Sequence, residues 1–129
     1  MKVHSDDVIQ IIGFPADSHR EPVSLIADDK TLQQTPFHIE ERSAKINMST
    51  KKLKVTVDEG NGEITIEDVY GEILFQEGPR LIVPGIVLDE KVNHIQQSFE
   101  WADDEALYGL GQHQNGIFNW RGHYVELVQ

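Results

Sequence analysis

Several residue types are scarce in this sequence, and each scarcity excludes a class of structure or function. The chain of 129 residues has no cysteine, so it can form neither a disulfide nor a thiolate zinc site nor a cysteine nucleophile. Basic residues are also few, because 11 Lys and Arg stand against 22 Asp and Glu and give a formal net charge of −11. The only local basic cluster is Lys51, Lys52 and Lys54. Nucleic acids and anionic membranes are bound through clustered Lys and Arg, so we expect neither as a partner.

Long apolar runs are missing as well. The longest, at residues 81–88, has eight residues and contains Pro84 and Gly85, which is too short to cross a bilayer as a helix. The first seven residues lack the apolar stretch of a signal peptide. The sequence therefore leaves the compartment open between the bacterial periplasm or another extracytoplasmic space and the cytoplasm.

What the sequence does contain is typical of one β-rich domain over residues 1–129. Hydrophobic residues make up 39% and charged residues 26% of the chain, as in ordinary globular domains. The runs Val8–Phe14 and Val23–Ala27 are rich in branched side chains and predict strands. No segment shows the capped helical pattern that a βαβ unit needs, so a parallel α/β fold is not expected.

The clearest pattern is an antiparallel meander over residues 52–76. In Lys52–Val57, apolar and polar residues alternate, as in a strand with one buried face. The next residues, Asp58–Gly62, contain an Asn-Gly pair, which favours a tight hairpin turn. Glu63–Asp68 then predicts the return strand and Ile73–Gln76 a third one.

Two later segments carry further predictions. Residues 88–101 fit a helical stripe and a strand about equally, and periodicity alone leaves both open. From Phe99 onward the chain holds six of its ten aromatic residues and four of its ten glycines. Tyr124–Gln129 predicts another strand, which the end of the chain interrupts. We therefore expect a truncated domain whose last strand is an unpaired edge, and such an edge favours association.

Most candidate catalytic patterns are better explained as ordinary structure. Asp103, Asp104 and Glu105 are carboxylates of the kind that glycosidases use, but adjacent side chains diverge, so a solvated turn is the preferred interpretation. His113 and His123 are ten residues apart and lack the spacing of a metal site. The Gly109-Leu110-Gly111 stretch has no βαβ frame around it, which argues against phosphate binding. We expect no catalytic residue, no metal and no cofactor in this chain.

The stretch from Gln112 to Gly122 is the best candidate for binding. Amide side chains, an arginine and two aromatic rings in a glycine-flanked loop suit a sugar, because polar groups bind its hydroxyls and rings cover its C–H face. The alternative is a structural loop whose rings enter the core and whose amides bind backbone groups. The predicted substrate-binding residues are Gln112, His113, Asn115, Phe118, Asn119, Trp120 and Arg121.

Residues 105–114, followed by Phe118-Asn119 and Arg121-Gly122, resemble the end of the N-terminal domain of glycoside hydrolase family 31. That family contains α-glucosidases and α-xylosidases. The order of the upstream meander and of residues 99–108 agrees with the same domain. The Gly-Gln-His-Gln sequence at 111–114 is more similar to the bacterial α-xylosidase branch.

The resemblance implies an antiparallel β-sandwich of the galactose-mutarotase-like class, in which residues 92–101 form a strand. It also implies a (β/α)₈ catalytic barrel in the same native chain as partner, carrying the two aspartates of a retaining mechanism. On this basis the 129 residues alone are inactive, the reading frame continues past Gln129, and the 112–121 loop borders a pocket for an oligosaccharide substrate.

Two alternatives from other classes stay open. One is an independent carbohydrate-binding module that stacks sugars on Phe118 and Trp120. The other is a small epimerase-like enzyme on the same sandwich, for which the sequence offers only His113 and Glu126.

Overall fold

The computed structural model describes residues 1–13, 35–111 and 114–126, and these form eight β-strands without any helix. In the part of the chain described, no helix therefore exists that could cross a membrane. The strands are β1 (Lys2–Ser5), β2 (Val8–Gln10), β3 (His38–Arg42), β4 (Lys45–Ser49), β5 (Leu53–Asp58), β6 (Ile64–Asp68), β7 (Ile73–Val87) and β8 (Glu90–Glu100).

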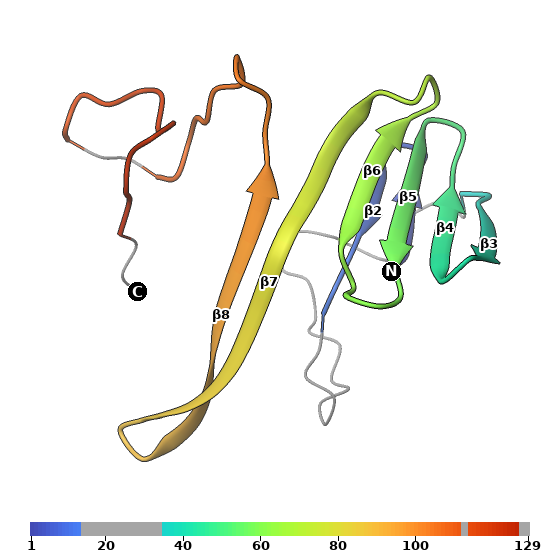
Figure 1. Cartoon of the computed structure of the whole chain (residues 1–129). Helices are drawn as coiled ribbons and strands as arrows, with labels where there is room; N and C mark the ends of the chain where they lie inside the picture. The colour runs from blue at the N-terminus through green and yellow to red at the C-terminus, as the bar shows by residue number, and fades with distance from the viewer. Residues whose placement is uncertain (14–34, 112–113, 127–129) are drawn as a thin grey trace.

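The strands form two antiparallel layers of very different size (Figure 1). The large sheet has the order β3-β4-β5-β6-β7-β8, so every strand pairs with its neighbour in sequence. The small layer is the β1–β2 hairpin. Such a meander needs only short connections, which explains why turn residues recur along the sequence.

The core lies between the β1–β2 hairpin and the middle of the large sheet. Met48, Val55 and Ile64 are its buried side chains, with exposed fractions of 2%, 0% and 6%. Val3 and Ile9 pack against them from the small layer. Side chains alternate between the two faces of a strand, so β4, β5 and β6 each contribute to this face and turn polar residues outward.

The predicted meander is confirmed, with one difference at its first turn. β5, β6 and the start of β7 pair in register, for example Val55 with Ile66. The connection at 59–63 is a five-residue loop rather than a two-residue turn. Gly62 has a φ of 73°, but Asn61 does not adopt a positive φ. Asp58 sets the shape of the loop because its carboxylate accepts the N–H of Gly60 at 2.8 Å.

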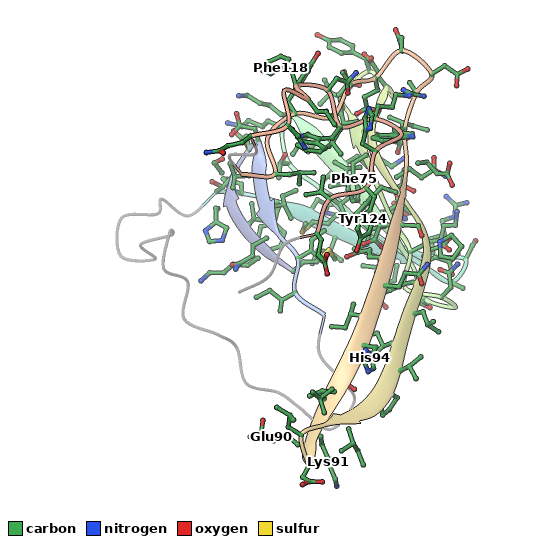
Figure 2. The ribbon with its side chains drawn as sticks, turned by 90° about the vertical axis from the view of Figure 1, so that its left-hand side faces the viewer. Phe75, Glu90, Lys91, His94, Phe118 and Tyr124 are labelled. Carbon is green, nitrogen blue, oxygen red and sulfur yellow. The ribbon has the colours of Figure 1, made fainter. Side chains whose placement is uncertain are left out.

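The family resemblance implied a strand at residues 92–101, and this is confirmed up to Glu100, since these residues belong to β8. Its partner β7 is much longer than the predicted Ile73–Gln76, because it continues to Val87 through two prolines and two glycines. A bulge between Glu77 and Arg80 accommodates Gly78 and Pro79. Beyond it, residues 81–96 form a two-stranded extension, here called the arm, which projects past the rest of the sheet (Figures 1 and 2).

Other expectations at the strand level need correction. The predicted strand Val8–Phe14 covers only Val8–Gln10, and residues 11–13 are irregular because the β1 partner has just four residues. Residues 124–126 of the predicted last strand are also irregular. The remainder of both runs, and the predicted strand Val23–Ala27, lie outside the described residues. Strands β1, β3 and β4 were not predicted. In β3 every side chain is exposed, so burial does not produce an alternating pattern there.

Candidate functional site

The chain leaves β8 at Glu100, and the described residues between 101 and 126 contain no strand. We call residues 101–122 the rim loop. It begins with a turn at 103–104, as predicted for the acidic triplet, and Glu105 accepts the N–H of Ala102 at 3.1 Å. These carboxylates lie at an exposed surface turn and do not face one another across a cleft.

Arg121 closes the rim loop from within. Its Nη1 donates to the carbonyl oxygens of Ala102 and Glu105, both at 2.6 Å. The guanidinium also lies 5.1 Å from the centre of the Trp101 ring, in the range of a cation–π contact. Its planar set of donors suits this task, because it can hold two carbonyls and stack at the same time.

Asn119 and Trp120 fasten the loop to its own first half. The side-chain oxygen of Asn119 accepts the N–H groups of Leu107 and Arg121, each at 3.1 Å. The backbone N–H of Trp120 donates to Leu107 at 2.8 Å, and the indole Nε1 donates to the carbonyl of Gly109 at 3.1 Å. Trp120 is only 4% exposed, so its ring serves as the small core of the loop.

The bend of the rim loop depends on consecutive left-handed residues. Gly109, Leu110 and Gly111 have φ angles of 95°, 59° and 88°. Glycine adopts such angles without a steric penalty, whereas leucine rarely does. The two glycines therefore serve this bend, and the Gly-x-Gly pattern has a structural explanation.

Phe118 and Asn115 are exposed and do not fasten the second half of the loop to the first. The Phe118 ring is 80% exposed and lies 4.8 Å from the ring of Tyr108, which is 56% exposed. Asn115 is exposed and its side-chain oxygen accepts the N–H of Ile117 at 3.1 Å. Figure 2 shows Phe118 at the end of the molecule opposite the arm tip, where Glu90 and Lys91 lie.

The seven predicted binding residues thus divide into groups. Asn119, Trp120 and Arg121 come together as the hydrogen-bonded frame of the rim loop, in which Asn119 is exposed and Trp120 is buried. Asn115 and Phe118 lie on its outer surface. Gln112 and His113 lie outside the described residues. Among the described residues no group of three or more His, Asp or Glu side chains is placed to hold a metal ion.

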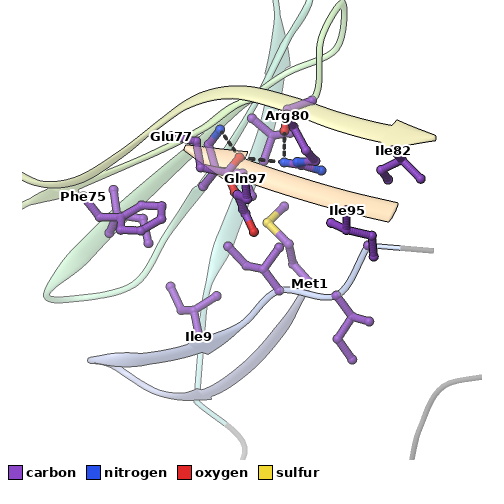
Figure 3. A pocket seen from close by; sticks show the side chains of 15 residues that line it. Met1, Ile9, Phe75, Glu77, Arg80, Ile82, Ile95 and Gln97 are labelled. Carbon is purple, nitrogen blue, oxygen red and sulfur yellow. Dashed lines mark hydrogen bonds and ion pairs between the residues drawn. The ribbon is translucent and has the colours of Figure 1, made fainter. Parts of the chain in front are cut away.

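A second polar cluster, which the sequence did not single out, lies in a cavity of about 610 Å³ between the two layers (Figure 3). Glu77 is 5% exposed and accepts hydrogen bonds from the Ile64 N–H at 3.1 Å, from Arg80 Nη2 at 2.6 Å and from the Gln97 amide. Arg80 Nη2 also donates to the carbonyl of Gly62 at 3.1 Å. Only the Gly78-Pro79 pair, which is typical of a bulge, marks this place in the sequence.

Most of the cavity wall is apolar, with Ile9, Ile66, Phe75 and Ile95 among the lining side chains. Both carboxylate oxygens of Glu77 already accept hydrogen bonds from the protein. The cavity is therefore best described as incompletely filled space between the two layers. It does not bring an acid, a base and a nucleophile together.

Comparison with known proteins agrees with this picture. The sequence profile of the glycosyl hydrolase 31 N-terminal galactose mutarotase-like domain matches residues 1–129. An α-xylosidase of Saccharolobus solfataricus is 33% identical over 73 residues, which are 55% of this chain and 9% of that protein. The crystal structure of a family 31 α-xylosidase from Xanthomonas citri superimposes with a TM-score of 0.68 and 33% identity, over 74% of this chain and 11% of that one.

The chain thus spans about a tenth of the length of these two relatives, as the shares of 9% and 11% show. The match over all 129 residues, the antiparallel two-layer fold and the rim-loop residues all point the same way. The chain belongs to the N-terminal galactose mutarotase-like domain family of glycosyl hydrolase 31.

Proposed function

We propose that this domain is the non-catalytic N-terminal part of a longer α-glycosidase, that it packs on the catalytic barrel, and that the enzyme prefers α-xylosides. The observation that carries the proposal is the family match over residues 1–129, together with two relatives that are both described as α-xylosidases. The described residues support a non-catalytic role, because Glu77 is held in its ion pair with Arg80 and the acidic triplet at 103–105 lies at a surface turn.

The rim loop is the part of the domain proposed to border the substrate pocket. Asn119, Trp120 and Arg121 give it a fixed shape, and Phe118 with Tyr108 presents an aromatic surface on the outside. Aromatic faces cover the C–H side of sugar rings and amides bind the hydroxyls. Phe118 and Asn115 are therefore the side chains assigned to contact the outer units of an oligosaccharide, and Gln112 and His113 belong to the same loop.

The substrate is tested with the complete native chain that contains these residues. We expect kcat/KM for an aryl α-xyloside to exceed that for the matching α-glucoside about tenfold or more, since a pocket shaped for xylose rejects the extra hydroxymethyl group. Absence of turnover on both substrates, or a preference for the glucoside, overturns the α-xylosidase assignment.

The role of the rim loop is tested in the same chain with Phe118→Ala. The KM for xyloglucan oligosaccharides should rise about fivefold, which corresponds to the loss of one ring contact, while an aryl α-xyloside is turned over as before. Tyr70→Ala is the matched control, because Tyr70 is 92% exposed on the turn between β6 and β7. Equal changes in KM for the two substitutions would show that the rim loop does not border the substrate pocket.

A further titration distinguishes the domain from an independent binding module. We expect no heat of binding when xyloglucan oligosaccharides are added to residues 1–129 alone. Binding that Phe118→Ala abolishes would favour the module instead.

A further inference from the structure

Among the residues that the structure describes, the two strands of the arm, at residues 81–96, pair only with each other. β6 pairs with β7 at Ile73–Gln76 and no further. Past the bulge, the seven pairs from Leu81 with Gln96 to Val87 with Glu90 join β7 and β8 alone. An isolated two-stranded hairpin is at best marginally stable in water. Its length beyond the sheet therefore calls for a covering element.

Both faces of the arm carry exposed apolar side chains, and three isoleucines share the face that continues the core side of the sheet. Ile82, Ile86 and Ile95 are 46%, 74% and 69% exposed. Ile82 and Ile95 form a cross-strand pair and also line the cavity under the β1–β2 hairpin (Figure 3). Ile86 lies on the same face because it is four residues from Ile82 along the strand. This face continues the core side of the sheet beyond the reach of the small layer.

The two edges of the arm differ in their ability to accept another strand. The arm ends in a two-residue turn at Leu88 and Asp89, whose φ angles of 49° and 65° fit a type I′ hairpin. Val87 and Glu90 flank this turn and form a hydrogen-bonded pair, so in the alternating ladder Pro84 and Asn93 form a pair of the other kind. Their backbone groups point outward. Pro84 lacks an N–H and blocks the β7 edge, whereas β8 has neither proline nor glycine in its 11 residues.

We propose that the outer edge of β8 in the arm is the docking site for a further β-strand of the same glycosidase chain, which extends the large sheet and places an apolar side chain beside Ile95. The inference rests on the proposed function, namely that a longer chain carries this domain. Long edge strands in folded proteins are normally paired or covered, and a strand on β8 would turn the two-stranded arm into a more stable three-stranded sheet. A net charge of −11 opposes pairing with a second copy.

The test is backbone hydrogen exchange at single residues of β8. In residues 1–129 alone, the outward N–H groups of Asn93 and Ile95 should exchange fast, while those of Val92 and His94, which face β7, exchange more slowly. In the complete native chain all four should be slow, and exchange at Asn93 and Ile95 should be slower by roughly 100-fold. Fast exchange at Asn93 and Ile95 in the complete chain overturns the proposal.

A variant pair tests the same edge through stability. Asn93→Pro removes an outward N–H and leaves the bonds to β7, whereas Asn93→Thr keeps the N–H in a residue that favours strands. In the complete chain, Asn93→Pro should lower the melting temperature by about 3 °C or more relative to Asn93→Thr. Equal melting temperatures contradict strand docking. If the proline variant does not fold, the exchange pattern of the unmodified chain decides.

The remaining outcomes separate this inference from the proposed function. A complete chain that protects Asn93 and Ile95 but does not hydrolyse α-xylosides keeps the docking site and refutes the substrate. A complete chain that hydrolyses α-xylosides but leaves both amides unprotected keeps the proposed substrate and refutes the docking site. Protection in residues 1–129 that grows with protein concentration would make the occupant a second copy and overturn the proposal.

Discussion

Glu77 is a charged side chain in the interior of the sheet, and its surroundings explain how it is tolerated. It accepts hydrogen bonds from a backbone N–H, from the Arg80 guanidinium and from the Gln97 amide. A buried carboxylate is costly unless such donors surround it. The group of residues therefore holds the bulge of β7 against β6 and β8 at the point where the arm begins.

Replacement of this carboxylate should be among the most destabilising substitutions of a polar side chain in the domain. Glu77→Gln replaces one of the two acceptor oxygens by an NH2 group that faces a donor and leaves the Arg80 charge unpaired, so we expect a loss of about 3 kcal/mol in the free energy of unfolding. Denaturant unfolding measures it. The control is Glu72→Gln, since Glu72 is exposed; equal losses for the two variants would refute the role of the cluster.

The residues of the rim loop show what sequence can establish about a site. The composition of residues 112–122 was enough to predict a loop built from amides, arginine and aromatic rings. It could not tell Phe118, which is 80% exposed, from Trp120, which is 4% exposed. That difference arises from the turn at Gly109–Gly111, which folds the chain so that one ring is enclosed.

At the scale of elements, the β1–β2 hairpin is fastened to the large sheet at its turn. The Thr50 hydroxyl donates to the carbonyl of Asp6 at 2.6 Å, and Lys52 Nζ lies 2.8 Å from Asp7 Oδ2. The Lys52 ammonium, and next the Ser5 hydroxyl, donate to the Asp7 carboxylate and lower its pKa. The same ion pair raises the pKa of Lys52.

This contact predicts a pH dependence with a definite sign. Because the pKa of Asp7 is lower in the folded state than in the unfolded one, the contact stabilises the hairpin above the unfolded pKa, and its contribution is lost as the pH falls through the folded value. Lys52→Met should raise the pKa of Asp7 toward its ordinary value in a carboxylate NMR titration. Lys51→Met is the control and should leave it in place; no change in Lys52→Met would contradict the ion pair.

The arm turn carries strain that a substitution should relieve. Leu88 and Asp89 both occupy the left-handed region, which costs roughly 1 kcal/mol or more for a residue such as leucine. The double change Leu88→Asn and Asp89→Gly supplies the residues that a type I′ turn prefers, so the arm should gain about 1 kcal/mol. Slower amide exchange at Val87 and Glu90 would report it. Leu88→Ala should give no comparable gain, and a gain of the same size would show that strain is not the cause.

Strand prediction succeeded where local pattern and tertiary context agree. The alternation at 53–57 and 64–68 is sufficient for β5 and β6, which pair with each other. It failed for the far half of β7, because Pro84 and Gly85 argue against a strand locally. An edge position tolerates the proline, and Gly85 leaves the space that the His94 ring occupies, since a Cβ there would lie 2.7 Å from it. Such compensation from β8 is not visible in a single strand's sequence.

At the scale of the whole molecule, charge and exposed apolar surface act against each other. The net charge of −11 keeps copies apart at neutral pH, while the arm exposes isoleucine, leucine and valine side chains. Near the sequence pI of about 4.8 the repulsion disappears. Light scattering of residues 1–129 should therefore rise steeply as the pH falls from 7 toward the pI.

A neutral substitution separates the two contributions. Ile86→Ser removes a side chain that is 74% exposed and leaves the charge unchanged. If the molecules associate through the arm, light scattering near the pI should be lower in this variant than in the unmodified domain. Undiminished scattering would assign the association to another part of the domain.

The order of the large sheet bears on how the chain acquires its structure. Every contact between its strands joins neighbours in sequence, so the chain closes only short loops at each step, which favours rapid folding. In a protein that begins with this domain, such a sheet can assemble hairpin by hairpin as it leaves the ribosome, before later parts exist. During that interval the β8 edge stands uncovered, and we expect this to be the stage at which the nascent protein depends most on chaperones.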